Sequence, residues 1–233
     1  MAERTQLPLA FPHRPNLTEA DFLPNQGNRL ALEFLAKTDE WPQRRLLLWG
    51  AAGTGKSHLL HIWACRHGAG LIQGPTLDAP IWPGGAVAID DIDQAPSEPA
   101  LLHLLNAASE AGLPVLMTAA RPPGRRPVHL ADLASRLRAT NAVEIGPADE
   151  AFLATLLAKL LAERQLRVPA ELRSWLLTRL PRTPSAIQAA VAQLDQAALA
   201  AGAAITRKLA ERALAGLFLD GDREASQADP PLG

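Results

Sequence analysis

The sequence predicts an α/β protein with a parallel sheet of five strands, followed by a small helical domain. Short runs rich in Leu, Val and Ile alternate with longer stretches of helical periodicity, a pattern typical of a parallel sheet covered on both faces. The runs span residues 44–50, 70–74, 85–91, 114–120 and 142–146. After Pro147 the strand pattern stops and only helical patterns follow, so a second unit is expected there.

Composition narrows the classes of protein that this chain can be. With 233 residues, 48% of them hydrophobic, it can bury a core in one large or two small domains. The single cysteine, Cys65, excludes an internal disulfide framework and fits a reducing, cytoplasmic compartment, and we expect it to be a small core residue. No apolar run approaches the roughly 20 residues of a membrane span. A net charge of −1 gives no bulk attraction to nucleic acid, so DNA binding would depend on the short basic cluster at 121–127.

The chain divides into four segments by composition and periodicity. The helical patterns of the second unit cover 149–165, 169–180, 184–201 and 206–219. The last residues are polar and contain prolines, which is typical of a disordered tail. We therefore expect an extended arm at 1–20, a nucleotide-binding α/β domain at 21–147, a helical lid at 148–219 and a tail at 220–233.

The segment GAAGTGKS at 50–57 matches the phosphate-binding loop G-x-x-x-x-G-K-[ST]. Its three glycines allow backbone N–H groups to curl around phosphates, Lys56 supplies a positive charge, and the Ser57 hydroxyl can bind magnesium. The loop follows an expected strand and begins an expected helix, which is the context that the motif requires.

A second acidic element, AVAIDDID at 86–93, follows another expected strand. In this position Asp90 would hold magnesium and Asp91 would polarise the attacking water. A charged junction between a strand and a loop is the simpler alternative. Together with the phosphate loop upstream, the element favours a P-loop ATPase.

The order of several motifs resembles the DnaA/Hda family of AAA+ proteins, over residues 4 to 217. These motifs are DFLP at 21–24, GAAGTGKSHLLH at 50–61, AIDDID at 88–93, VLMTAARPP at 115–123 and DLASRL at 132–137. The stretch 118–137 and the opening arm are similar to the Hda type in particular. The resemblance implies an AAA+ P-loop fold with a helical lid that binds ADP or ATP and Mg²⁺.

Site roles follow from the resemblance. It implies nucleotide-binding roles for Gly50, Gly53, Thr54, Gly55, Lys56, Ser57, His58, Thr118 and Arg182. Among these, Thr118 lies in the first sensor region, and Arg182 is the nearest arginine to the second sensor position, which Ser185 occupies in a gapless comparison. Magnesium would be held by Ser57 and Asp90. Arg136 matches an arginine finger that acts on the nucleotide of a neighbouring subunit.

The opening arm resembles the short Q-L-x-L-x-[LF] peptide by which Hda-type proteins bind the sliding clamp of DNA polymerase III. Gln6, Leu7, Leu9 and Phe11 match that pattern. Extended peptides of this kind place alternate side chains in pockets, and Pro8 would lower the ordering cost of binding. The alternative is that the apolar side chains fold back on the chain's own domain.

The function implied by the resemblance is regulation of replication initiation. Such a protein would bind the clamp and DnaA and promote hydrolysis of DnaA-bound ATP, with weak or no ATPase activity of its own. The helical DNA-binding domain of DnaA is not expected after the lid, so DNA would be contacted only through the clamp. No contact with a membrane is expected. Homo-oligomerisation is left open. Two alternatives remain: a DnaA-like DNA-binding or helicase-loading factor that uses the 121–127 cluster, and a P-loop phosphotransferase.

Overall fold

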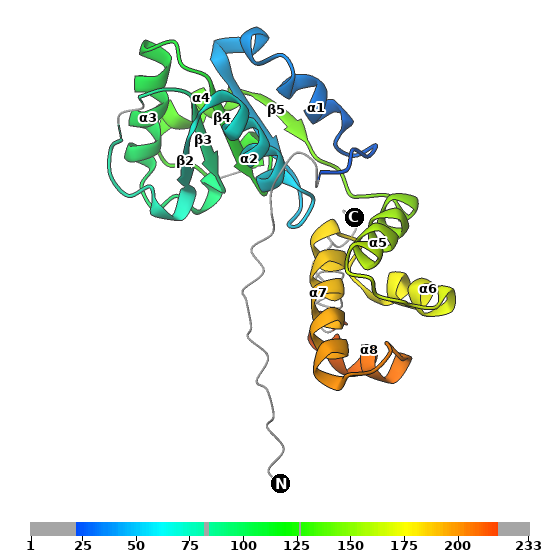
Figure 1. Ribbon diagram of the computed structural model, residues 1–233. Coiled ribbons are helices and arrows are strands. Elements are labelled where there is room, and N and C mark those ends of the chain that lie inside the picture. Colours follow the sequence, from blue (N-terminus) through cyan, green and yellow to red (C-terminus); the bar gives the residue numbers. More distant parts are fainter. Residues whose placement is uncertain (1–21, 82–83, 126, 219–233) are drawn as a thin grey trace, which may run out of the picture. The chain divides into compact units, whose positions relative to one another are not determined.

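The computed structural model describes residues 22–81, 84–125 and 127–218 (Figure 1). The arm with Gln6, Leu7, Leu9 and Phe11 and the tail at 220–233 lie outside these residues. The described chain forms two compact units, one with residues 22–153 and Arg182–Ser185, the other with residues 154–181 and 186–218.

The first unit is built on a parallel sheet of five strands. The strands are β1 (Arg45–Trp49), β2 (Gly70–Gln73), β3 (Val87–Asp90), β4 (Val115–Ala119) and β5 (Asn141–Glu144). Their order is β2-β3-β4-β1-β5, and every neighbouring pair is parallel (Figure 1). The three inner strands are almost wholly buried, which explains their continuous apolar sequences. The predicted α/β class and the five-stranded parallel sheet are confirmed.

Helices cover both faces of this sheet. They are α1 (Arg29–Leu35), α2 (Lys56–His67), α3 (Glu98–Glu110) and α4 (Ala131–Arg138). Because side chains alternate along a strand, Leu47 of β1 packs with α3 and α4, whereas Leu46 and Leu48 pack with α1 and α2. Short 3₁₀ turns occupy Thr38–Glu40, Pro42–Arg44, Gly74–Thr76, Ile92–Gln94 and Pro123–Arg125. The sheet therefore lies between two apolar layers. These layers hold the strand ends, and the loops that follow them, in place.

The expectation that Cys65 is a core residue is wrong. Cys65 is exposed on α2. Helical periodicity turns Leu59, Ile62 and Trp63 of the same helix toward the sheet and places Cys65 on the outer face. Its position on the helix, not its residue type, decides its exposure.

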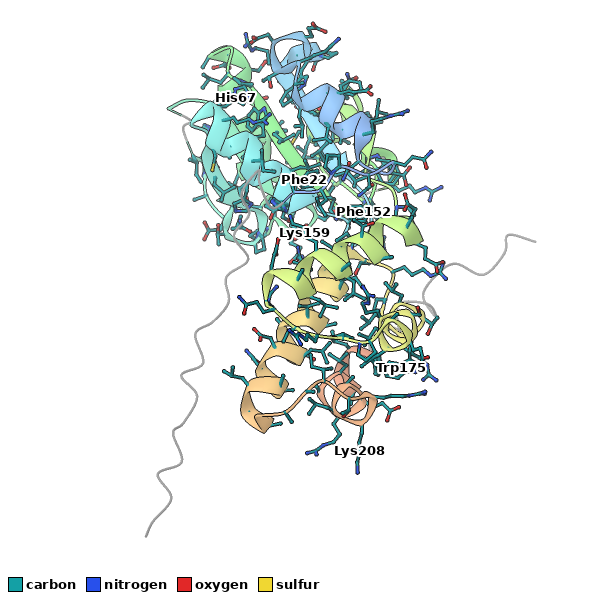
Figure 2. All side chains as sticks on the ribbon, turned by 45° about the vertical axis from the view of Figure 1, so that its right-hand side comes forward. Phe22, His67, Phe152, Lys159, Trp175 and Lys208 are labelled. Carbon is teal, nitrogen blue, oxygen red and sulfur yellow. The ribbon has the colours of Figure 1, made fainter. Side chains whose placement is uncertain are left out.

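The second unit is helical. Its helices are α5 (Glu150–Glu163), α6 (Ala170–Arg179), α7 (Pro184–Ala201) and α8 (Arg207–Ala213). Their buried leucines and alanines form the interior, and Trp175, labelled in Figure 2, packs edge-on against Phe218 with 5.5 Å between ring centroids. Thr206 begins α8 as its N-cap, because its hydroxyl accepts the N–H of Leu209 at 3.3 Å. Among the described helices, none has both the length and the apolar character to cross a bilayer.

Candidate nucleotide-binding site

The loop between β1 and α2 is a turn that only glycines can form. Gly50 has a φ of +151°, and a Cβ there would lie 2.4 Å from the carbonyl oxygen of Ile145. Gly55 has a φ of +102° and immediately precedes α2. Within the loop, the Thr54 hydroxyl donates to the Ala51 carbonyl at 3.0 Å. The loop thus delivers a constrained backbone to the N-terminus of a helix, which is a favourable place for an anion.

Lys56 lies over this loop and is buried. Its Nζ donates to the carbonyl oxygens of Gly50 and Ala51, both at 2.8 Å. Burial lowers the pKa of Lys56, while the nearby carboxylates of Asp91, Asp90 and Asp93 act in the opposite direction. The ammonium group is therefore held at the loop by carbonyls that a phosphate oxygen can replace.

Asp90, the last residue of β3, joins three elements through one carboxylate oxygen. Its Oδ1 accepts the hydroxyl of Ser57 from α2 at 3.0 Å and the hydroxyl of Thr118 from β4 at 2.6 Å. The Thr118 hydroxyl in turn accepts the backbone N–H of Asp91 at 2.8 Å. Asp90 is 6% exposed and Thr118 is fully buried, so these hydrogen bonds are shielded from water.

The residues around Asp90 fit a magnesium ion that arrives with a nucleotide. Ser57 and Asp90 present a hydroxyl and a carboxylate oxygen next to each other, and Mg²⁺ prefers such hard oxygen ligands. In the parts of the chain that the structure describes, no group of three or more His, Cys, Asp or Glu side chains forms a metal site. The pair therefore suits a cation whose remaining ligands come from phosphates and water.

Asp91 has an unusual backbone and an unusual carboxyl group. Its φ of 54° is left-handed, and the glycine at position 74 permits this arrangement, since a Cβ on Gly74 would lie 2.0 Å from the Asp91 carbonyl oxygen. Burial raises the pKa of Asp91, the charges of Asp90 and Asp93 raise it further, and Lys56 acts against them. A carboxylate with a raised pKa binds a proton more strongly, which suits a group that polarises water.

Phe22 belongs to the DFLP motif at 21–24, but the sequence indicated no role for it in the site. Its ring lies edge-on to His58 with 5.2 Å between centroids, and its Cε2 is 3.6 Å from where a Cβ on Gly55 would be. Phe22 is labelled in Figure 2 within the α/β unit. The aromatic ring therefore covers the C-terminal part of the phosphate loop, and its place directly before Leu23 and Pro24 in the sequence is the signal that could have identified it.

The segment Arg182–Ser185 groups with the α/β unit and reaches the phosphate loop through small side chains. A Cβ on Gly53 would lie 2.1 Å from the Ser185 Oγ and 3.2 Å from the Thr183 Cβ, so glycine is required for this approach. Arg182 itself is exposed. Its role as second sensor stays a prediction, and Ser185 is the residue of this segment that contacts the loop.

Arg136 lies far from its own phosphate loop. It is in the last turn of α4, where the Thr140 hydroxyl donates to its carbonyl oxygen at 2.9 Å. Asn141, the next residue, pairs with Leu46 near the amino end of β1, whereas the phosphate loop leaves the carboxyl end of that strand. The length of β1 separates these ends by about 13 Å, from a rise of about 3.3 Å per residue. The half-buried Arg136 thus lies near the amino ends of the strands, and the phosphate loop lies at their carboxyl ends.

The basic cluster at 121–127 borders a groove of about 880 Å³ beside the site. Its lining includes the basic side chains of Arg121 and His129 and the acidic side chains of Asp93 and Glu98. The Glu98 carboxylate accepts the backbone N–H groups of His129 at 3.0 Å and of Leu130 at 2.8 Å. Burial acts to raise the pKa of Glu98, but these hydrogen bonds outweigh it and lower the pKa. Glu98 thereby holds the end of the basic loop to the start of α3.

Several solved structures share this architecture, although no protein-family model matches the chain. Domain III of DnaA from Thermotoga maritima superposes with a TM-score of 0.72 at 18% identity, covering 89% of this chain and 99% of that one. The fold is the AAA+ fold. RuvB from Thermotoga maritima, a Holliday junction branch migration motor, gives a TM-score of 0.62 at 19% identity, over 83% of this chain and 70% of its own.

A further AAA+ match is DnaA from Aquifex aeolicus bound to AMPPCP. It superposes with a TM-score of 0.60 at 19% identity, over 78% of this chain. The match spans 65% of the length of that DnaA chain. The expected AAA+ fold is therefore shown. At sequence identities this low, the comparisons establish the fold alone.

Proposed function

We propose that this protein is an AAA+ regulator of replication initiation that binds ADP or ATP, attaches to the sliding clamp of DNA polymerase III, and promotes hydrolysis of DnaA-bound ATP. The observation that carries the proposal is the position of Arg136, at the end of the strands opposite the chain's own phosphate loop. This position supports a role toward a nucleotide held by a neighbouring subunit rather than toward the chain's own nucleotide.

Nucleotide binding is supported by the geometry of the phosphate loop. Lys56 would exchange its two carbonyl contacts for phosphate oxygens, and Ser57 with Asp90 would hold the accompanying Mg²⁺. The magnesium ion, when bound, neutralises phosphate charge. The similar DnaA from Aquifex aeolicus binds AMPPCP, which agrees with a nucleotide at this place in the fold.

The regulatory step in this proposal takes place on the partner. DnaA presents its ATP to the face that carries Arg136, and the guanidinium stabilises negative charge that develops on the transferring phosphoryl group. Arginine fingers contribute on the order of 10³ to 10⁵ in rate in GTPases. Asp91 and Thr118 would serve the chain's own nucleotide, whose hydrolysis is expected to be slow or absent.

In this proposal, binding to the clamp determines where in the cell the protein acts. The arm residues Gln6, Leu7, Leu9 and Phe11 would dock in the apolar groove of the clamp and leave the AAA+ unit tethered beside DNA. Tethering raises the effective concentration of one partner near another to the millimolar range for short linkers. Initiation would then be suppressed only where a clamp has been loaded.

The test is release of phosphate from ATP-loaded DnaA, with this protein present, with and without clamp loaded on DNA. We expect stimulation that depends on loaded clamp and is lost in Arg136→Ala. Arg138→Ala, a matched change two residues away on the exposed side of the same helix end, should stimulate as the wild type does. Equal stimulation by Arg136→Ala and the wild type would remove the basis of the proposal.

A DnaA-like DNA-binding or helicase-loading function is the second candidate, and the groove beside the basic loop favours it. Arg121 and His129 both line that groove, and Arg125 of the same loop is exposed. Phosphate contacts make binding fall steeply with salt. Salt-sensitive binding to DNA in the absence of clamp, lost in Arg121→Ala, would favour this function over the first.

A further inference from the structure

Arg45, the first residue of β1, is an arginine in the interior. It is 3% exposed, and its Nε and Nη1 atoms have no hydrogen-bond partner among the described residues. The partner of Nη2 is the neutral side-chain amide of Gln43. A buried charge without an acidic partner is unfavourable for stability, so this arginine calls for a role other than holding the fold together.

The strand register places Arg45 beneath the helix end that carries Arg136. Arg45 and Leu47 alternate with Leu46, so they share the face of the sheet that α4 covers through Leu137. One residue before the β1–β5 ladder begins, Arg45 lies beside Thr140, and the Thr140 hydroxyl is bonded to the carbonyl of Arg136.

The charge of Arg136 acts on the buried guanidinium of Arg45. Burial lowers the pKa of Arg45, and the positive charge of Arg136 lowers it further. The backbone of Arg45 is held by pairing with Val115 of β4, and its side chain is buried, so its charge has little freedom to move. Arg136 is on the helix surface and only half-buried, so its side chain has more freedom of orientation. Repulsion from the fixed charge disfavours conformers in which Arg136 lies back over β1.

We propose that Arg45 is a positioning residue for Arg136, whose fixed charge holds the finger side chain extended away from its own domain and toward the neighbouring subunit. This inference rests on the proposed function, and it adds a residue that acts through the finger without touching the nucleotide. Preorganisation of this kind raises the rate of the chemical step without changing how tightly the two proteins associate.

The experiment compares Arg45→Met, Arg45→Lys and Arg44→Met in clamp-dependent ATP hydrolysis by DnaA. Arg45→Met should lower the maximal rate roughly tenfold, while the concentration that gives half-maximal stimulation stays unchanged. Arg45→Lys keeps a positive charge only while the buried ammonium stays protonated, so it is assayed at pH 6, where it should restore the rate to within about twofold. Arg44→Met is the control, since Arg44 pairs with Asp39 at 2.8 Å and is not buried.

A double mutant separates positioning from a general structural effect. In the Arg136→Ala background, Arg45→Met should cause no further loss, because the group on which it acts is gone. The melting temperature of Arg45→Met should stay level or rise, since an unpaired buried charge is removed. Arg45→Gln, which is polar and uncharged, provides the same comparison if the methionine variant does not fold.

Two results would overturn the inference. Wild-type rates in Arg45→Met, or a lysine variant as slow as the methionine variant, would show that the charge of Arg45 does not position the finger. If Arg136→Ala itself stimulates normally, the proposed function fails, and the positioning role fails with it. The single mutants therefore tell the two failures apart.

Discussion

Thr118→Val tests whether the hydrogen bonds around Asp90 hold the site together. Thr118 is fully buried, donates to the Asp90 Oδ1 at 2.6 Å and accepts the Asp91 N–H at 2.8 Å. Valine has nearly the same shape, so the substitution removes the hydroxyl and leaves the packing in place. Both partners of that hydroxyl then lose it in a water-poor environment.

The magnitude follows from those two contacts. A hydrogen bond to a charged group is worth about 1.5–3 kcal/mol, and a buried N–H left without a partner costs about 1–3 kcal/mol. Asp90 keeps the hydrogen bond from Ser57, and losses at neighbouring groups are not additive. We therefore expect Thr118→Val to lower the free energy of unfolding by about 3 kcal/mol in total. For a protein of this size, that lowers the melting temperature by about 6–12 °C.

Thr118→Ser is the matched control, measured by thermal unfolding followed by circular dichroism. Serine keeps the hydroxyl and loses one buried methyl group, which costs about 1 kcal/mol and about 2–4 °C. The gain in melting temperature from ADP with Mg²⁺ over ADP alone should also shrink in Thr118→Val, because Asp90 is less firmly oriented. Equal melting temperatures for the valine and serine variants would refute the idea that this hydroxyl joins β3 and β4.

Three further predictions concern the nucleotide, the pH dependence and the arm. Lys56→Ala should weaken ADP binding by about 10- to 100-fold in calorimetry, as loss of a charge-assisted contact implies, while ADP should raise the wild-type melting temperature by several degrees. Burial raises the pKa of Asp91 above its usual value, so the ionised carboxylate is destabilising at pH 7 and this cost disappears as pH falls below the unfolded-state pKa. Asp91→Asn should therefore have a higher melting temperature than the wild type at pH 7, and the difference should shrink toward pH 4. Replacing Gln6, Leu9 and Phe11 together by Ala should abolish clamp binding in a pull-down with an unchanged melting temperature, and unfolding of this variant would mean that the arm belongs to the core.

Local sequence patterns were sufficient for the strands and for the phosphate loop. Apolar runs predicted each of the five strands to within a few residues. Burial on both faces explains the runs of β1, β3 and β4, whereas β2 and β5 are largely exposed. The glycines around Lys56 mark a turn that few other residues can form. Such features depend on residues close in sequence, so they can be recognised without knowing the rest of the fold.

The contacts that define the site were decided by tertiary structure. Ser57, Asp90 and Thr118 are widely separated in the chain, and only the parallel register of β3 and β4, with α2 across them, brings their oxygens to one point. Phe22 belongs to the DFLP motif, but nothing in that motif indicates its contact with His58, and Arg45 belongs to no motif. Both residues gain their neighbours from packing.

The sequence by itself determined which segments are strands and helices and which loop carries the phosphate-binding motif, since backbone sterics and the alternation of apolar residues act over a few positions. The order of the strands determined where the phosphate loop, Arg136 and Arg45 lie relative to one another. Placing β1 between β4 and β5 puts the phosphate loop at one end of the strand and Arg136, with Arg45 beneath it, at the other. That separation comes from hydrogen bonding between strands distant in the chain, which no local pattern specifies.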